Sequence, residues 1–176
     1  MKKRFVILLI FFFIATSGPY AQAQQKDVKG WRDARWGLNE DQLLALFKGE
    51  AIRLNEVVEY KEWYAAIAIP NYEISDYEYT VHFLMDKKNK TLEQVNIIAT
   101  SKTLESIYKA FSQLEKVLRE KYGPPSFRND GETDTRDVIW NFPSIIIDLS
   151  LMDMKIIHFK NLVIKYTQPT KDKNKI

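Results

Sequence analysis

The chain has 176 residues and no cysteine, with 26 Lys and Arg against 23 Asp and Glu. The missing cysteine excludes disulfides, thiol catalysis, Cys-ligated zinc and a lipid anchor attached through a cysteine. Three of the basic residues lie in the first 23 positions, which contain no acidic residue, so the remainder balances at 23 against 23. A nucleic-acid-binding protein normally carries a clustered basic excess, and we therefore expect no nucleic-acid partner.

The N-terminus has the three parts of an export signal. A basic stretch at residues 2–4 precedes an apolar run from Phe5 to Ala15, and Ala21 and Ala23 are the small residues that a signal peptidase accommodates. The run has eleven residues, against the roughly twenty that a membrane-spanning helix needs. We expect residues 1–23 to be a cleaved signal peptide rather than an uncleaved anchor. The protein is then periplasmic or secreted, with no transmembrane segment after cleavage.

A polar leader at residues 24–30 precedes one predicted domain over residues 31–167. Asn39 begins its first helix, because it can cap the free amide groups with Gln42 as its reciprocal partner. Gly49 is a typical residue for the helix end. The two-residue alternation of half-buried strands then predicts four strands, at residues 57–60, 63–69, 77–85 and 92–100.

A second, longer helix is predicted over residues 104–122, where apolar residues recur at steps of three and four before Gly123-Pro124-Pro125. Further strands are expected at residues 138–142, 144–151 and 162–167, and a mobile polar tail at 168–176. The pattern does not decide between strand and loop for residues 152–160. The order of one helix, four strands, one helix and three strands predicts an α+β fold. In this fold two helices pack on one face of a twisted, mainly antiparallel sheet.

Two groups of residues have the chemistry of a metal site without its spacing. His82 and His158 are the only histidines and have no ligand neighbours in the sequence, although zinc would need several ligands together. A polar loop carries alternating carboxylates, as calcium loops do: Asp130, Glu132, Asp134 and Asp137. Residues of the wrong type stand where such a loop has its glycine and its bidentate glutamate. We expect no catalytic residue, no metal and no cofactor.

Aromatic rings are dense between Tyr60 and Tyr79, and exposed Tyr and Trp are typical of contact surfaces. Under the two-residue alternation Tyr64 and Tyr72 fall on neither core face of the predicted strands. Ala66 and Ala68 beside Tyr64 form a patch of small residues. The sequence therefore predicts a partner surface made of four residues: Tyr64, Ala66, Ala68 and Tyr72.

Three short motifs carry a resemblance: Arg35-Trp36-Gly37-Leu38 before the first helix, Lys121-Tyr122-Gly123-Pro124-Pro125 at the end of the second, and Trp140. Together they resemble a largely uncharacterised family of small exported bacterial proteins. In that family a Trp-Gly-Met/Leu segment leads into a short helix and a Tyr-Gly-x-Pro segment ends a longer one. The plan is also remotely similar to beta-lactamase-inhibitor-like modules and to small outer-membrane assembly lipoproteins, which bind proteins. The missing lipid-bearing cysteine distinguishes this chain from the lipoproteins.

These observations predict a non-catalytic, protein-binding module of the bacterial cell envelope. Its partner would be another envelope or secreted protein, which it contacts through one face or edge of the sheet. The alternative is a small-ligand carrier or an envelope enzyme with a pocket between the long helix and the sheet. Trp36 and Gly37 are expected to be structural, with Trp36 filling the edge between helix and sheet and Gly37 turning the chain into the helix cap.

Overall fold

The structure is a computed structural model that describes residues 27–131 and 135–169. The predicted signal peptide, residues 24–26 of the leader, Glu132, Asp134 and residues 170–176 of the tail lie outside the described residues. The helices and strands, in chain order, are α1 (Glu40–Leu46), β1 (Ile52–Glu59), β2 (Trp63–Ile74), β3 (Tyr77–Asp86), β4 (Leu92–Ala99), α2 (Ser101–Leu104), α3 (Ile107–Tyr122), β5 (Phe127–Asn129), β6 (Thr135–Asn141), β7 (Ile146–Met154), the 3-10 helix η1 (Lys155–Ile157) and β8 (Phe159–Thr167).

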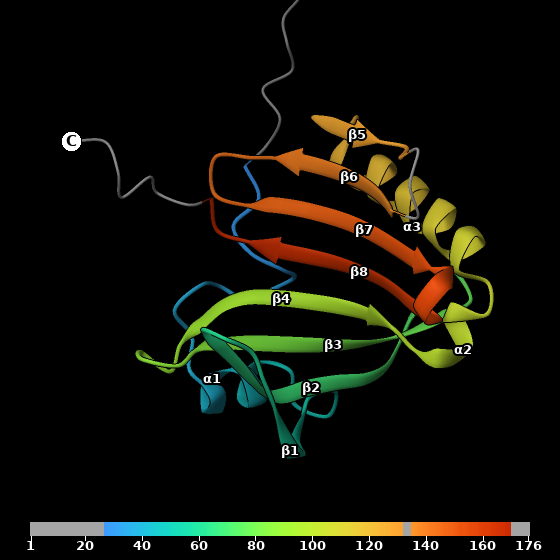
Figure 1. Cartoon of the computed structure of the whole chain (residues 1–176). Helices are drawn as coiled ribbons and strands as arrows, with labels where there is room; N and C mark the ends of the chain where they lie inside the picture. Colours follow the sequence, from blue (N-terminus) through green and yellow to red (C-terminus); the bar gives the residue numbers. More distant parts are fainter. Residues whose placement is uncertain (1–26, 132–134, 170–176) are drawn as a thin grey trace, which may run out of the picture.

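The strands form one antiparallel sheet in the order β1-β2-β3-β4-β8-β7-β6-β5. The sheet consists of two four-stranded meanders, β1–β4 and β5–β8, in which neighbouring strands follow one another along the chain. The meanders join at β4 and β8, where Gln94 pairs with Thr167 and Ile98 with Val163. Figure 1 shows this join at the middle of the sheet, with α2 and α3 connecting the first meander to the second.

The predicted fold class is wrong. The described residues contain eight strands in one sheet and three α-helices, not the predicted two helices with four and then three strands. The strand that was not predicted is β5. All of its residues are exposed, so it has no apolar alternation to recognise, and it forms because its backbone pairs with β6. The predicted second helix corresponds to α3 and begins three residues later than expected, because Leu104 is the last residue of the separate helix α2. The undecided residues 152–160 comprise the end of β7, η1 and the start of β8.

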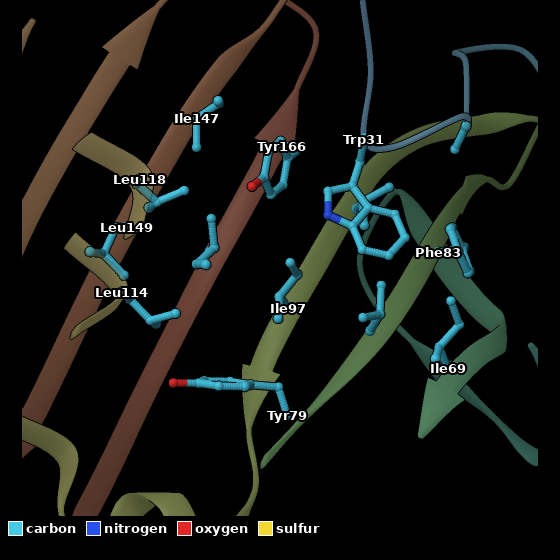
Figure 2. Packing of buried hydrophobic residues seen from close by; sticks show 14 of the residues in the cluster. Trp31, Ile69, Tyr79, Phe83, Ile97, Leu114, Leu118, Ile147, Leu149 and Tyr166 are labelled. Carbon is cyan, nitrogen blue, oxygen red and sulfur yellow. The ribbon is translucent and has the colours of Figure 1, made fainter. Parts of the chain in front are cut away.

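One face of the sheet, which we call the core face, carries the hydrophobic core of both meanders. The strand registers align Phe83, Val95 and Tyr166 across β3, β4 and β8, and each of these side chains is at most 3% exposed. Phe47, the residue directly after α1, stacks on Phe83 with ring centroids 5.3 Å apart. Figure 2 shows Leu114 and Leu118 of α3 directed at β7 on the same face. The core therefore runs without interruption from one meander to the other.

Trp31, in the segment before α1, lies over the join between the meanders. Figure 2 shows its indole between Tyr166 and Phe83, and its side chain is 2% exposed. Its ring centroid lies 5.7 Å from those of Phe47 and Tyr72 and 6.0 Å from that of Phe83. Edge-to-face contacts of this kind stabilise a core beyond the area that they bury, so Trp31 links α1, β2 and β3.

The Trp36-Gly37 pair fastens the same segment to both meanders. Gly37 donates its N–H to the Leu92 carbonyl of β4 at 3.0 Å and has a φ of +90°, which glycine adopts without strain. The Trp36 indole donates to the Ser144 carbonyl, between β6 and β7, at 3.4 Å. Asp27 accepts hydrogen bonds from the Ser144 hydroxyl at 2.6 Å and from its N–H at 3.0 Å. Through these contacts Trp36 and Gly37 hold the segment before α1 against the sheet.

The opposite face of the sheet carries a row of polar side chains. The registers align His82, Asn96, Lys165 and Asp148 across four strands, and Lys165 donates to Asp148 at 3.2 Å. The Nδ1 atom of His82 is buried and has no hydrogen-bond partner among the described residues. Burial lowers the pKa of His82, because removing the imidazole from water disfavours its charged form.

Replacing Phe111 by Ala is expected to reduce the free energy of unfolding by about 3–5 kcal/mol, the usual cost of deleting a buried ring. Phe111 lies in the middle of α3 and is 1% exposed. Urea unfolding of the two proteins measures the difference. Lys116→Ala, on the exposed side of α3, is the matched control and should have little effect. A loss below about 1 kcal/mol for Phe111→Ala contradicts the packing of α3 on the sheet.

His82, which is half-buried with its Nδ1 atom out of contact with water, is expected to make the protein less stable in mild acid. Its folded-state pKa lies below the ordinary 6.5, so the unfolded chain binds the proton first as the pH falls. The stability contributed by neutral His82 is fully present above the unfolded pKa and is lost as the pH falls toward the folded pKa. The melting temperature of His82→Gln should decrease less than that of wild type between about pH 7.5 and pH 5.5. His158→Gln, at an exposed position, should behave like wild type; equal decreases in all three proteins would exclude His82 as the cause.

Candidate functional site

The four residues of the predicted partner surface do not share one exposed face. Tyr64 is 8% exposed and Ala68 is fully buried, whereas Ala66 and Tyr72 are half-buried. Two register shifts between β2 and β3 explain this, one between Tyr64 and Ile67 and one between Ile69 and Tyr72. Each shift reverses the alternation, because an extra residue in one strand moves the following side chains to the other face. Tyr64 and Tyr72 therefore lie on the core face.

Tyr72 packs edge-on against Trp31, whereas Tyr64 reaches a polar hollow at the side of the core. The Tyr64 hydroxyl donates to Glu40 at 2.8 Å. The Lys90 ammonium lies 4.6 Å from the centroid of the Tyr64 ring, within the range of a cation–π contact. Tyr64 is thus the residue of the predicted surface that lines this hollow.

The hollow has a volume of about 520 Å³ and is lined by residues of four elements: Asn39, Glu40, Asp41, Arg53, Tyr64 and Lys90. The N-terminal cap of α1 forms part of this lining through Asn39. Asn39 and Gln42 cap each other's backbone N–H groups at 2.9 Å, the reciprocal arrangement that the sequence predicts. This cap fixes the first turn of α1, from which Glu40 and Asp41 project.

Arg53 of β1 neutralises the acidic side of the hollow. Its guanidinium forms ion pairs with Glu40 and with Asp41, the latter at 2.6 Å. The Arg53 side chain is 51% exposed and that of Asp41 is 88% exposed, so water screens these pairs and a ligand can reach both charges. Lys90 contributes a second cation from the turn between β3 and β4 and forms no ion pair within the described part of the chain. The hollow thus offers both signs of charge to solvent.

The pKa shifts in the hollow hold its groups in their ordinary charge states. Burial opposes the negative charge of Glu40, but hydrogen bonds from Tyr64 and Arg53 outweigh burial and lower the pKa of Glu40. Burial and the hydrogen bond to Glu40 raise the pKa of Tyr64 to about 12. A general acid or base works best with a pKa near the operating pH. Glu40 and Tyr64 are both shifted away from neutrality, so the hollow is better suited to binding than to proton transfer.

The hollow lies beside an exposed apolar edge of the sheet. β1 is an outermost strand, and Ile52, Val57 and Val58 on it are 48%, 47% and 36% exposed. Its register with β2 shifts between Arg53 and Val58, so that residues 54–57 are opposite the single residue Ala66. This bulge interrupts the pairing of β1 with β2 next to the hollow.

Those candidate metal ligands that the structure describes are not brought together by the fold. His82 lies in β3 and His158 follows η1 at the end of a hairpin. Asp130 is paired with Arg128 at 2.7 Å, and Asp137 accepts a hydrogen bond from Ser150 at 2.7 Å. Over residues 27–131 and 135–169 no group of three or more His, Asp or Glu side chains is arranged to hold a metal ion.

The region between α3 and the sheet is packed with apolar side chains. Ala110, Phe111 and Leu114 of α3 are at most 1% exposed, as are Leu149 and Leu151 of β7. A polar-lined pocket in this position was the alternative suggested by the sequence. The hollow at α1 lies elsewhere, and its charged residues Glu40, Arg53 and Lys90 were not identified from the sequence. Two of the lining residues were singled out from the sequence, Asn39 as the helix cap and Tyr64 as part of the predicted partner surface.

Comparisons of the chain with protein-family models, with curated proteins and with solved structures found no significant match. The resemblance to small exported bacterial proteins therefore stays a prediction. Among the helices of the described residues, none has the length and apolar character needed to cross a membrane.

Removing the Tyr64 hydroxyl is expected to raise the pKa of Glu40 toward its ordinary value of 4.5, because the carboxylate loses a hydrogen bond that favours its charged form. Nuclear magnetic resonance titration of the Glu40 carboxyl in wild type and in Tyr64→Phe measures this change. Tyr60→Phe is the matched control, since Tyr60 does not line the hollow. A Glu40 pKa that is equal in Tyr64→Phe and wild type would show that the hydroxyl does not stabilise the carboxylate.

Proposed function

We propose that this protein is a non-catalytic binding module of the bacterial cell envelope, which binds an extended segment of another protein along β1. The observation that carries the proposal is the exposed apolar edge of β1 beside the charged hollow at α1. We call these two features together the β1 surface.

An outermost strand can pair with a further strand, because the backbone groups on its free side lack partners within the sheet. Extended peptides use such edges, where backbone hydrogen bonds give affinity and side-chain pockets give specificity. On β1 the exposed Val57 and Val58 supply apolar contacts. The bulge at residues 54–57 limits long, unselective pairing of the kind that leads to aggregation. The β1 surface therefore favours a short segment.

The hollow supplies the side-chain recognition. Arg53 and Asp41 present opposite charges that are largely exposed, and Lys90 lies beside them in the lining of the hollow. A segment that carries both an acidic and a basic side chain can replace the internal ion pairs with pairs of its own. The partner that fits best is thus an extended chain with apolar side chains toward the valines and mixed charges toward the hollow.

The pKa shifts support binding over catalysis at this surface. Glu40 keeps its negative charge because its pKa is lowered, and the Tyr64 hydroxyl keeps its proton because its pKa is raised to about 12. Neither group is ready to exchange a proton near neutral pH. The proposed location of the protein in the cell envelope is supported by the export signal expected at residues 1–23.

Blocking the edge of β1 is expected to reduce partner binding. The double variant Val57→Lys, Val58→Lys places two charges on the edge, a device that prevents strand addition. Quantitative mass spectrometry of envelope proteins captured by wild type and by the variant should show a reduction of at least about tenfold for the specific partner. Arg53→Ala, which tests the hollow alone, should reduce capture of the same protein.

Phe127→Lys is the matched control, because Phe127 is 52% exposed on β5, the opposite edge of the sheet. It should capture as much as wild type, with melting temperatures similar in all four proteins. A partner retained equally by the Val57→Lys, Val58→Lys protein would rule out β1 as the binding edge. A partner lost equally in Phe127→Lys would also contradict the assignment.

A further inference from the structure

A second surface lies at the turn between β7 and β8, away from the β1 surface. Four large apolar side chains are exposed within six residues of this turn: Met154 (38%), Ile156 (95%), Ile157 (65%) and Phe159 (45%). We call residues 154–160 the β7–β8 tip. Figure 1 shows η1, at the centre of this tip, at the end of the sheet next to α2 and remote from α1.

The turn itself does not explain why these residues are apolar. Hairpin turns favour Gly, Asn, Asp and Ser, which suit the turn backbone and remain solvated. Here Lys155–Ile157 form a 3-10 turn that ends at His158 in the left-handed region, with a φ of +51°. Two isoleucines at the exposed corners contribute nothing to the core. Residues that break a local rule in this way are expected at functional sites.

The charges of the β7–β8 tip have one sign. Lys155 and Lys160 are both exposed, and residues 154–160 contain no acidic residue. The neighbouring Asp153 is 4% exposed and accepts a hydrogen bond from Tyr108 of α3 at 2.9 Å, so its carboxylate is turned inward. The β7–β8 tip is therefore apolar at its end and basic at its sides, although residues 24–176 of the chain carry no net charge.

The β7–β8 tip is also held rigidly. β7 and β8 are paired without interruption from Ile146 and Thr167 to Met154 and Phe159. Leu151 and Leu162, the nearest core residues, are at most 1% exposed. The apolar end is therefore presented at a defined place, and little order is lost when it binds.

We propose that the β7–β8 tip binds the surface of an anionic phospholipid bilayer. Ile156 and Ile157 would enter the boundary between head groups and acyl chains, with Lys155 and Lys160 at the lipid phosphates. Apolar residues flanked by lysines are the pattern of interfacial membrane binding, and lysine stems can lie along the apolar layer while their ammonium groups reach the phosphates. A protein partner fits the tip less well than a bilayer does. Each side of a stable protein interface contributes about 20–30 residues, far more than this narrow turn provides.

The absence of cysteine from the chain allows a single fluorescent label to test the proposal. Ile156→Cys is labelled with the environment-sensitive dye NBD and mixed with vesicles of phosphatidylglycerol and phosphatidylcholine in equal parts. We expect a blue shift and an increase in emission, as the dye enters the apolar layer. Phe127→Cys, labelled in the same way, places the dye on the edge strand β5 and should show neither change.

The lysines are tested in the labelled protein with Lys155→Gln and Lys160→Gln together. Each lysine near an anionic surface contributes about a fivefold factor in binding, so the pair should weaken vesicle binding about thirtyfold. Equal signals at positions 156 and 127, no signal at 156, or an equal signal with pure phosphatidylcholine would each overturn the proposal. A blue shift that grows with protein concentration without vesicles would also overturn it, because the β7–β8 tip would then bind a second copy of the chain. Binding at β1 can fail or succeed independently of these outcomes.

Discussion

The pairing of β4 with β8 is the constraint on which the structure depends. Each meander is built from neighbouring strands and requires only short connections, but β4 and β8 are separated in the chain by α2, α3 and three strands. Their pairing from Gln94–Thr167 to Ile98–Val163 turns two four-stranded units into one sheet. It also aligns Ile97 with Ile164 on the core face, so that neither meander has to complete a core alone.

One continuous core face then determines what lies on the outside. α1 and the segment around Trp31 cover the first meander, and α3 covers the second, where Leu114 and Leu118 face β7 (Figure 2). With the apolar side chains gathered on this face, exposed apolar residues elsewhere need their own explanation. They occur mainly on β1 and at the β7–β8 tip. The two proposed contact surfaces therefore lie at an edge and at an end of the same rigid sheet.

Tyr64 shows how a local irregularity changes the interpretation of a sequence. A strict alternation through β2 places Tyr64 and Tyr72 away from Ile67 and Ile69, which is why both were predicted to be on a partner surface. The two register shifts of β2 against β3 bring them to the core face instead. Tyr72 becomes a neighbour of Trp31, and Tyr64 becomes a wall of the hollow. No residue type in the sequence marks a bulge of this kind with certainty, because its position depends on the partner strand.

Elements with local signals can be derived from the residues of one segment at a time. The cap at Asn39, the apolar stripe of α3 and the alternation along β3 and β4 follow from side-chain chemistry and helical or strand periodicity within one segment. Three features instead depend on contacts between distant segments: the existence of β5, the joining of the meanders, and the meeting of Glu40, Arg53 and Lys90. These features arise from backbone pairing and from packing between distant segments. Because any strand can supply the same backbone hydrogen bonds, the choice of partner is not written in the residues of one strand and is decided by the core that all strands share.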